Sequence, residues 1–407
     1  MFDARAPAGK QRKKVTSTGG TPLRALRIHK PKDVRIDQVP DPQIEHPRDA
    51  IVRVTTTCIC GSDLHIYNGI IPQPRPMTLG HEFMGIVEEV GAEVDNLKKG
   101  DRVFVPFPIA CGQCWFCARG LPVQCERSNP QKYGPTGGWF DEKGAALFGY
   151  TDFYGGYDGG MAEAVRVPYA DHGPRKVPEE LTDEQVIFLT DILPTGWSGL
   201  DWAAVKGGET VAVFGCGPVG LMAQKLAWLR GAGRVIGLDL QDYRLEAARR
   251  TANSETINIR QGDPAEHIWE MTEGRGADVC IDAVGMEADA SLLEKVGDVL
   301  RVQAGGLNAL KMAIKACRRG GTVSILGVYA TDYDNFPLGQ LFDKGITLKM
   351  GQALAHNYVD ELLEHIQSGR LKADDIITHR LPLDEAPHGF QIFNKKDDGC
   401  VKIVMTP

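Results

Sequence analysis

The sequence predicts a two-domain protein in which a β-rich domain precedes a parallel α/β domain, and three observations support this. The chain has 407 residues, more than one hydrophobic core usually contains. From Leu23 to about Pro168 it is rich in Val, Gly, Pro and short runs typical of strands. After about Thr190, apolar strand-like runs alternate with helix-like segments, as in a parallel sheet covered by helices on both faces.

Composition and charge argue against several classes of protein. Hydrophobic residues make up 43% and charged residues 24% of the chain, as in ordinary globular proteins. We find no apolar run long enough to span a bilayer, and the formal charge of −7 leaves no basic surplus for nucleic-acid phosphates. We therefore expect a cytoplasmic protein with neither a membrane nor a nucleic-acid partner.

Residues 1–22 are polar and lack the apolar core of a secretory signal. Their basic stretch "KQRKK" could contact an anionic surface, but a solvated, disordered tail is the better interpretation.

In the β-rich domain, the runs at Ala50–Ile59 and Met84–Gly91 alternate well enough to be strands. Lys98–Val105 reads as a turn followed by another strand. About the last fifty residues are mixed in character again, so we expect them to rejoin the first domain. The predicted domains are therefore residues 23–192 together with 352–407, and residues 193–351.

The α/β domain opens with a glycine-rich turn. "GCGPVG" fits the pattern GxGxxG; it follows the strand run Thr210–Gly215 and begins the helix Pro218–Gly231. A second strand, Arg234–Asp239, comes next, and Tyr243–Arg250 begins another helix. Further buried strands are expected at 277–285 and 321–328. This is the context that a dinucleotide-binding fingerprint of a Rossmann domain requires, although a tight turn without a ligand is the alternative.

Each position of the fingerprint has a physical reason. Gly215 permits the tight turn, Gly217 lets a pyrophosphate approach the backbone, and Gly220 lets the helix pack on the strand. The helix N-terminus at Pro218 favours phosphate charge. Asp239 can accept hydrogen bonds from a ribose and would repel a 2′-phosphate, so we expect NAD rather than NADP. Arg244 either lies beside the ribose or is a solvated helix residue.

Four cysteines in "CGQCWFCARGLPVQC" are spaced C-x2-C-x2-C-x7-C, and the chain looks intracellular, where disulfides are disfavoured. Such spacing lets thiolates converge on one tetrahedral ion and predicts a closed structural zinc site. An iron–sulfur cluster is less well matched, because the fourth cysteine comes too late and no proline follows it. The expected zinc lobe is residues 111–125, with ligands Cys111, Cys114, Cys117 and Cys125.

A second group of metal donors is suggested by "CICGSDLH" (Cys58–His65) and by His81 with Glu82 in "GHE". A catalytic zinc needs about three protein ligands and an open position, and thiolate and imidazole are good donors. His81 by itself would more often be a structural histidine. Its pairing with Glu82 and with the upstream motif favours a metal site.

From Leu23 to the C-terminus the chain resembles the zinc-dependent medium-chain alcohol dehydrogenases. The motifs that carry the resemblance are "CGSDLH", "GHE", the four-cysteine lobe, "DILPTG" and "GCGPVG" with Asp239, in that order. The resemblance implies a GroES-like β-barrel catalytic domain joined to the Rossmann domain. It also implies two zinc ions per chain, NAD, an alcohol or aldehyde substrate, and a homo-oligomer, for which we favour a tetramer over a dimer.

The resemblance assigns the catalytic zinc ligands. It places Cys60, not Cys58, on the metal together with His81, and Cys58 is interpreted as a small buried side chain. The residues alone leave Asp63, Glu82 and Asp191 open as the third ligand; the resemblance selects Asp191, where many family members carry cysteine. This departure and the segment 285–306 resemble the branch of formaldehyde dehydrogenases and dismutases.

The remaining roles also follow from the resemblance. Ser62 would take the alcohol proton and His65 would pass it to solvent, while Asp63 would fix His81 and Glu82 would lie behind the zinc. The alternatives are a turn cap for Ser62, a surface histidine for His65 and a helix cap for Asp63. Further positions come by alignment alone: Thr195 and Val219 beside the nicotinamide, Phe107 and Trp197 in the substrate pocket or in the core, and Lys402 near the pyrophosphate or exposed.

The sequence therefore predicts an oxidoreductase that transfers a hydride between an alcohol, or a hydrated aldehyde, and NAD. The alternatives within the enzyme class are a formaldehyde dehydrogenase or dismutase with tightly held NAD, and a polyol dehydrogenase. A catalytically silent protein that binds zinc and nucleotide is the distant alternative.

Overall fold

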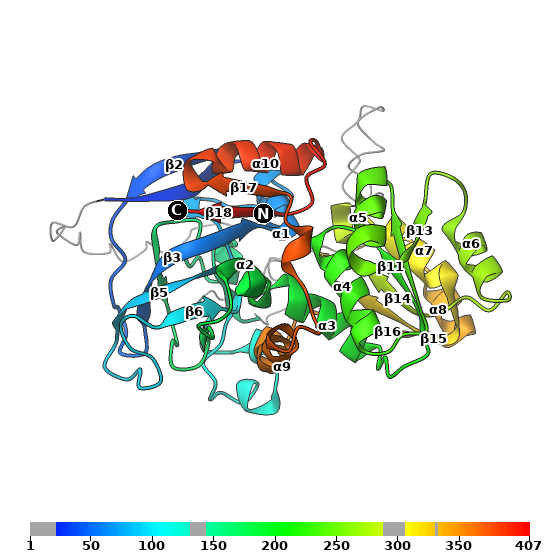
Figure 1. Cartoon of the computed structure of the whole chain (residues 1–407), viewed down its shortest axis with the longest axis horizontal. Helices are drawn as coiled ribbons and strands as arrows, with labels where there is room; N and C mark the ends of the chain where they lie inside the picture. The colour runs from blue at the N-terminus through cyan, green and yellow to red at the C-terminus, as the bar shows by residue number, and fades with distance from the viewer. Residues whose placement is uncertain (1–21, 131–143, 288–305, 330–332) are drawn as a thin grey trace, which may run out of the picture.

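The computed structural model describes residues 22–130, 144–287, 306–329 and 333–407. The predicted tail and most of the segment 285–306 lie outside the described residues. Figure 1 shows two bodies side by side: a β-rich body that contains both the start and the end of the described chain, and an α/β body formed by the middle of the chain. No helix in the described ranges is long and apolar enough to cross a bilayer.

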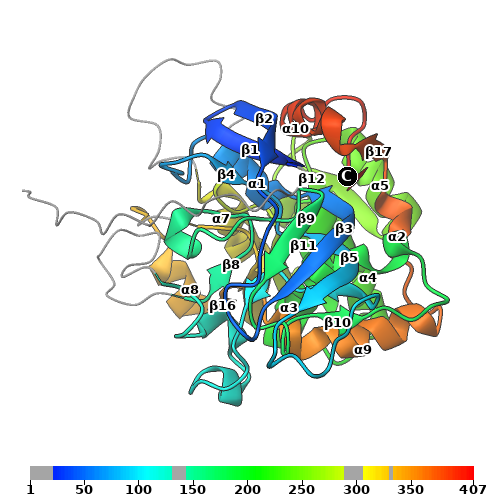
Figure 2. The ribbon, with the colours of Figure 1, turned by 90° about the vertical axis from the view of Figure 1, so that its left-hand side faces the viewer.

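The β-rich body is built around a seven-stranded sheet in the order β10-β6-β5-β3-β18-β17, with β9 also paired to β3. The last strand of the chain lies antiparallel to β3, with Val404 opposite Cys58, so the C-terminus completes the sheet that the N-terminal part begins. Figure 2 views this body face on. Its strands are β3 (Ala50–Ile59), β5 (Phe83–Val90), β6 (Arg102–Val105), β9 (Ala164–Val167), β10 (Arg175–Lys176), β17 (His379–Pro382) and β18 (Ile403–Thr406).

Among the described residues, two smaller sheets and four α-helices complete this body. The smaller sheets are β2-β1-β4 and β7-β8. Their strands are β1 (Leu23–Lys30), β2 (Asp33–Val39), β4 (Met77–Thr78), β7 (Pro108–Ile109) and β8 (Ala146–Leu147). The helices are α1 (Gly61–Tyr67), α2 (Asp183–Val186), α9 (Ala355–Gln367) and α10 (Ala386–Lys395).

The α/β body has one six-stranded sheet, and every strand pair in it is parallel. Its order is β13-β12-β11-β14-β15-β16, the arrangement of a doubly wound dinucleotide-binding fold. The strands are β11 (Thr210–Phe214), β12 (Arg234–Asp239), β13 (Glu255–Asn258), β14 (Ala277–Asp282), β15 (Cys317–Ile325) and β16 (Thr347–Met350). The helices are α3 (Ile192–Trp202), α4 (Pro218–Leu229), α5 (Asp242–Ala252), α6 (Pro264–Met271), α7 (Asn308–Ala316) and α8 (Leu338–Lys344).

Alternate residues of β11 face two different cores, which explains why this strand is apolar throughout. Val211 and Val213 pack in the cluster that contains Leu221 of α4, whereas Ala212 and Phe214 pack in another cluster, with residues of α6 and α7. A strand buried on both faces needs a continuous apolar run rather than alternation.

The first of these clusters continues into the β-rich body. Phe104 and Val404 of the seven-stranded sheet belong to it, as do Leu193 of α3 and Val359 of α9. The two bodies thus share buried side chains, and groups that lie between them are held by packing from both sides.

Candidate active site

Four buried side chains of types that can bind a metal meet between the two bodies. One donor atom from each of Cys60, His81, Glu82 and Asp191 lies within 4.8 Å of the other three. The Cys60 Sγ is 3.4 Å from Asp191 Oδ2, and His81 Nε2 is 3.2 Å from the same oxygen. Cys60 precedes α1, His81 and Glu82 precede β5, and Asp191 precedes α3. Residues from three distant parts of the chain therefore form one donor group.

Asp63 orients two of these donors. One of its carboxylate oxygens accepts a hydrogen bond of 2.9 Å from the Cys60 backbone N–H, at the start of α1. The other lies 3.2 Å from His81 Nδ1, which leaves the Nε2 of the ring toward Asp191. A carboxylate that holds the far nitrogen of a histidine fixes its orientation for metal binding. The position of Asp63 agrees with its predicted supporting role, and it also caps the helix.

The charge balance of the group fits a divalent cation. Burial, followed by the charge of Asp191, raises the pKa of the Cys60 thiol to about 12. Burial would also raise the pKa of Asp191, but hydrogen bonds from His81 and Thr195 hold it below its usual value. A thiol next to a buried carboxylate ionises readily only when a cation is bound, and thiolate, imidazole and carboxylate are zinc donors. The residues present therefore fit a zinc ion.

Glu82 lies at this group but turns toward Lys402. The ammonium of Lys402 is 2.5 Å from Glu82 Oε2 and donates 3.1 Å to the Ile59 carbonyl, and neither charged side chain is exposed at all. The expectation that Lys402 lies near the pyrophosphate is therefore wrong. Lys402 comes directly before Ile403, which pairs with Ile59 of β3. This register brings the Lys402 ammonium next to the metal donors, where it neutralises the Glu82 carboxylate.

The four cysteines of the predicted lobe also converge. Their sulfur atoms all lie within 4.8 Å of one another; Cys114 Sγ is 3.4 Å from Cys117 Sγ and 3.9 Å from Cys125 Sγ. The backbone N–H of Cys111 points at Cys125 Sγ across 3.4 Å. Four sulfur donors with backbone support fit a closed tetrahedral zinc site.

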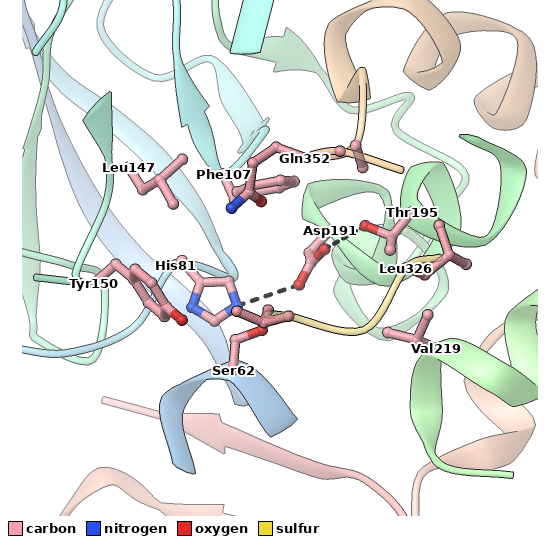
Figure 3. A pocket seen from close by; sticks show the side chains of 13 residues that line it. Ser62, His81, Phe107, Leu147, Tyr150, Asp191, Thr195, Val219, Leu326 and Gln352 are labelled. Atoms are coloured by element: carbon pink, nitrogen blue, oxygen red, sulfur yellow. Dashed lines mark hydrogen bonds and ion pairs between the residues drawn. The ribbon is translucent and has the colours of Figure 1, made fainter. Parts of the chain in front are cut away.

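A cavity of about 60 Å³ opens beside His81 and Asp191. Figure 3 shows Ser62 and Val219 on one side of it and Phe107, Leu147 and Gln352 on the other. The residues that line it are Ser62, His81, Phe107, Leu147, Tyr150, Asp191, Thr195, Val219, Leu326, Val328, Gly351, Gln352 and Ala353. Phe107, predicted to lie in the substrate pocket, lines this cavity, and so do Thr195 and Val219, predicted to lie beside the nicotinamide.

Trp197 lines neither this cavity nor the larger cleft described next. It is 6% exposed and packs in the core, with its ring 4.7 Å from the Arg230 guanidinium and 5.9 Å from the His365 ring. The prediction that it shapes the pocket is therefore wrong. Residue 197 comes nearly two turns into α3, so its side chain faces α9 rather than the cavity.

A cleft of about 730 Å³ runs along the carboxyl ends of the parallel strands. The predicted cofactor residues Gly215, Gly217, Pro218, Val219, Asp239 and Arg244 line it, together with Cys60, Ser62 and His65. Gly220 does not face the cleft; a Cβ there would come within 1.8 Å of the Gly215 carbonyl, so it serves helix packing as expected. The structure thus places this large cleft, which the predicted cofactor residues line, directly against Cys60.

The carboxylate of Asp239 is held at the edge of this cleft. It accepts hydrogen bonds from the backbone N–H groups of Cys216 (2.8 Å), Leu240 (2.7 Å) and Gln241 (2.9 Å). The Arg244 guanidinium lies 3.9 Å away. This orientation leaves a fixed negative charge at the end of β12, which is suited to ribose hydroxyls.

Sequence reasoning missed several lining residues. Tyr150 and Gln352 bring polar groups to the small cavity, and Arg260, Lys311 and Lys396 line the cleft. None of them belongs to a short motif. Gln352 follows Gly351, whose φ of +155° marks a bend directly after β16, and this is the only local signal that we find for it.

Comparisons with known proteins agree with this geometry. Residues 46–178 match the family model "Alcohol dehydrogenase GroES-like domain", and residues 218–309 match "Zinc-binding dehydrogenase". The chain is 45% identical over 389 residues to an uncharacterized zinc-type alcohol dehydrogenase-like protein of Bacillus subtilis, with 95% of this chain and 100% of that relative covered.

Two further relatives extend the comparison. A glutathione-independent formaldehyde dehydrogenase of Bacillus subtilis is 37% identical over 377 residues, with 88% of this chain and 86% of the relative covered. The solved structure of an alcohol dehydrogenase from Thermus sp. ATN1 matches with a TM-score of 0.81 and 36% identity, covering 94% of this chain and 99% of that one. The predicted GroES-like and Rossmann folds are confirmed, and the chain belongs to the zinc-type alcohol dehydrogenase family of oxidoreductases.

Proposed function

We propose that the protein interconverts a small alcohol, or a hydrated aldehyde, and its oxidation product with NAD and with zinc held by Cys60, His81 and Asp191. One observation carries this proposal. The small cavity beside the zinc donors and the large cleft share Ser62, Val219, Leu326 and Val328 in their walls. A substrate oxygen at the donors would thus place its carbon next to a nicotinamide in the cleft.

Zinc at these donors would supply Lewis acidity toward the substrate oxygen, and NAD would supply the hydride acceptor. The residues of the chain position the reactants. Thr195 Oγ1 donates a hydrogen bond of 2.7 Å to Asp191 Oδ1 and fixes the carboxylate, while Asp63 fixes the His81 ring. The arrangement keeps the donors in one geometry while the substrate enters and leaves.

Ser62 and His65 support the proton path. The Ser62 hydroxyl lies 4.0 Å from the Cys60 sulfur and lines both the cavity and the cleft, so it would accept the substrate hydroxyl proton. His65, on the same short helix, lines the cleft and would pass the proton outward. Both side chains are supplied by one turn of α1.

We assign NAD rather than NADP because of Asp239. Its carboxylate is held by three backbone N–H groups at the cleft edge, and a 2′-phosphate there would meet that charge. We also assign two zinc ions per chain, the second in the lobe of Cys111, Cys114, Cys117 and Cys125. A closed four-sulfur site has no open position for a substrate and serves to hold the lobe.

A formaldehyde dehydrogenase or dismutase with retained NAD is a second candidate. The cavity beside the zinc donors is small, about 60 Å³, which suits a short substrate such as hydrated formaldehyde. Gel filtration separates the alternatives: a cofactor that stays with the protein supports the dismutase, and turnover that depends on added NAD supports the dehydrogenase.

The test of the proposed function is zinc-loaded protein assayed with NAD and a panel of short alcohols and aldehydes, followed by absorbance of the reduced nicotinamide. Turnover that falls at least about a hundredfold in Ser62→Ala would support the assigned proton path. No absorbance change with any member of the panel would contradict the proposed function.

We also propose a homo-oligomer, a tetramer rather than a dimer. Leu338 and Phe342 on α8 and Met350 on the edge strand β16 are 67%, 87% and 55% exposed, as expected for side chains that another subunit covers. Sedimentation of the purified protein measures the assembly.

A further inference from the structure

The cavity beside the metal donors has polar groups at two separate ends. At one end are His81 and Asp191 with Ser62 and Thr195, which the proposed function assigns to metal binding, to orienting hydrogen bonds or to the proton path. At the other end Figure 3 shows the carboxamide of Gln352 projecting into the cavity from the side opposite Ser62. Phe107, Leu147 and Val219 form apolar parts of the walls between, and Tyr150 adds a phenol to the lining.

Gln352 is held in place from two directions. The backbone N–H of the next-but-one residue, Leu354, donates 3.2 Å to Ser198 Oγ on α3, the helix that begins after Asp191. Burial raises the pKa of the Tyr154 phenol, and the Gln352 side chain lies close enough to that phenol to lower it in part. Tyr154 in turn packs edge-on against Tyr150, with ring centroids 5.4 Å apart.

Tyr150 packs against both Tyr154 and the metal donor His81. Its ring lies edge-on to His81, with centroids 6.2 Å apart and an angle of 87° between the planes. Gln352 is therefore positioned relative to both His81 and Asp191 by packed aromatic rings and by α3. Such support from both sides gives a side chain a defined place in a binding site.

A carboxamide offers two donors and an acceptor with two lone pairs, more than one contact with Tyr154 can satisfy. A small monohydric alcohol would place its hydroxyl at the metal donors and its apolar end against Gln352. A compound with a second hydroxyl would place that group against the carboxamide instead. Gln352 is partly buried and its amide faces the cavity, so a substrate that covers it without offering a hydrogen bond would leave it unpaired. That loss is costly, and the amide would therefore discriminate between two such substrates.

Resting on the proposed function, we infer that Gln352 is a substrate-positioning residue that selects small diols, either the 1,1-diol of a hydrated aldehyde or a 1,2-diol, over monohydric alcohols of equal size. In both reactions a C–H bond breaks and its electron pair reduces NAD⁺ to NADH, while one hydroxyl proton is released. A 1,1-diol then yields the carboxylic acid, and ethane-1,2-diol yields the hydroxyaldehyde.

Two pairs of substrates with equal numbers of heavy atoms test the inference. Hydrated formaldehyde is compared with ethanol, and ethane-1,2-diol with propan-1-ol, by kcat/KM of the zinc-loaded enzyme. We expect the wild type to prefer the diol in at least one pair, and the pair that shows the preference identifies the class. Gln352→Met, which keeps the length of the side chain, should lower kcat/KM for that diol by about 10- to 100-fold and for its partner alcohol by less than about twofold.

A binding measurement separates recognition from turnover. With NADH in place of NAD⁺ no alcohol is oxidised, and the dissociation constant of ethane-1,2-diol, measured by calorimetry, should rise by a similar factor in Gln352→Met. Leu147→Val is the matched control, because it reshapes the same cavity without a hydrogen-bonding group. It should change both members of each pair by about the same factor.

The outcomes are distinct. If the wild type oxidises monohydric alcohols as well as their diol partners, or if Gln352→Met and Leu147→Val affect both members alike, the role of Gln352 is overturned while the proposed function stands. If the wild type oxidises no alcohol or aldehyde hydrate with NAD, the proposed function itself fails.

Discussion

The ammonium of Lys402 lies 2.5 Å from the Glu82 carboxylate, and both side chains are fully buried next to the metal donors. The same ammonium donates to the carbonyl of Ile59, the residue before Cys60, and Glu82 follows His81. Burial disfavours the charged form of Lys402, but the charges of Glu82 and of the nearby thiols raise its pKa well above the usual value. This buried ion pair therefore connects the two segments of the chain that contain the donors Cys60 and His81.

Removing one member of this pair should destabilise the protein. Lys402→Met leaves a buried carboxylate without its partner, and we expect the free energy of unfolding to fall by about 3–5 kcal/mol. The double variant Glu82→Gln/Lys402→Met should recover most of that loss. Urea unfolding of the zinc-loaded protein measures both. The control is Arg380→Met at the exposed pair with Glu184, expected to cost less than about 1 kcal/mol; equal losses in Lys402→Met and Arg380→Met would contradict the prediction.

Asp191→Ala should remove the catalytic zinc and leave the lobe zinc. The thiol of Cys60 and the ring of His81 alone offer too few donors for a stable site. We expect metal analysis to fall from about two zinc ions per chain to about one, with loss of turnover. Asp201→Ala, on the exposed side of the same helix, should keep both ions. Unchanged zinc content in Asp191→Ala would remove this residue from the ligand set.

Cys114→Ala should have the complementary effect. It removes one of four sulfur donors from the lobe, so we expect loss of about one zinc ion and a lower Tm, with the Cys60 group still loaded. Cys317→Ala serves as the control, because this buried thiol lies in the parallel sheet, outside both donor groups. A lobe variant that keeps two zinc ions would contradict the structural zinc site.

Asp239 should control the choice of cofactor. In Asp239→Ala the ribose loses its acceptor and a 2′-phosphate loses the opposing charge, so we expect the KM for NAD to rise about tenfold or more and the preference over NADP to shrink. Asp239→Asn keeps an acceptor for the backbone N–H groups. It therefore shows whether an effect on the KM comes from ribose recognition or from a change in the local fold. Exposed Asp242→Ala is the neighbouring control, and identical kinetics in all three variants would exclude Asp239 from the ribose site.

His356 should make stability fall in mild acid. Burial, and then the charges of His172 and Arg175, lower its pKa to about 3. Its ring stacks on His172 with centroids 5.3 Å apart, and Arg175 beside it pairs with Asp360 of the same helix. A histidine with a depressed folded pKa contributes its stability above the unfolded pKa, and that stability is lost as the pH falls toward the folded pKa.

The unfolded chain binds this proton below about pH 6.5, so the loss should reach about 1.4 kcal/mol per pH unit between there and pH 3. Urea unfolding at pH 7.5 and 5.5 should show a smaller loss in His356→Gln than in the wild type. Equal pH dependence in the two proteins would show that His356 is not kept neutral by the fold.

The elements that local pattern could reveal were predicted closely. Ala50–Ile59 and Arg234–Asp239 are strands with the expected bounds, because each is an apolar or alternating run that charged and turn residues terminate. The helix expected at Pro218 begins there and ends at Leu229, two residues before Gly231. The two predictions that were wrong concern side chains whose neighbours come from distant parts of the chain. Trp197 packs against α9 and Arg230, and Lys402 pairs with Glu82.

The sequence by itself determined the features whose contacts are local. The turn at Gly215, the carboxylate at the end of β12 and the four-sulfur lobe each depend on spacings of a few residues, which covalent geometry carries directly into space. Tertiary structure alone brought Asp191 to within 3.4 Å of Cys60, 131 residues away, buried Lys402 against Glu82, and turned Gln352 into the cavity. Those relationships depend on how two packed bodies share one core, and no local pattern records which distant side chains that packing brings together.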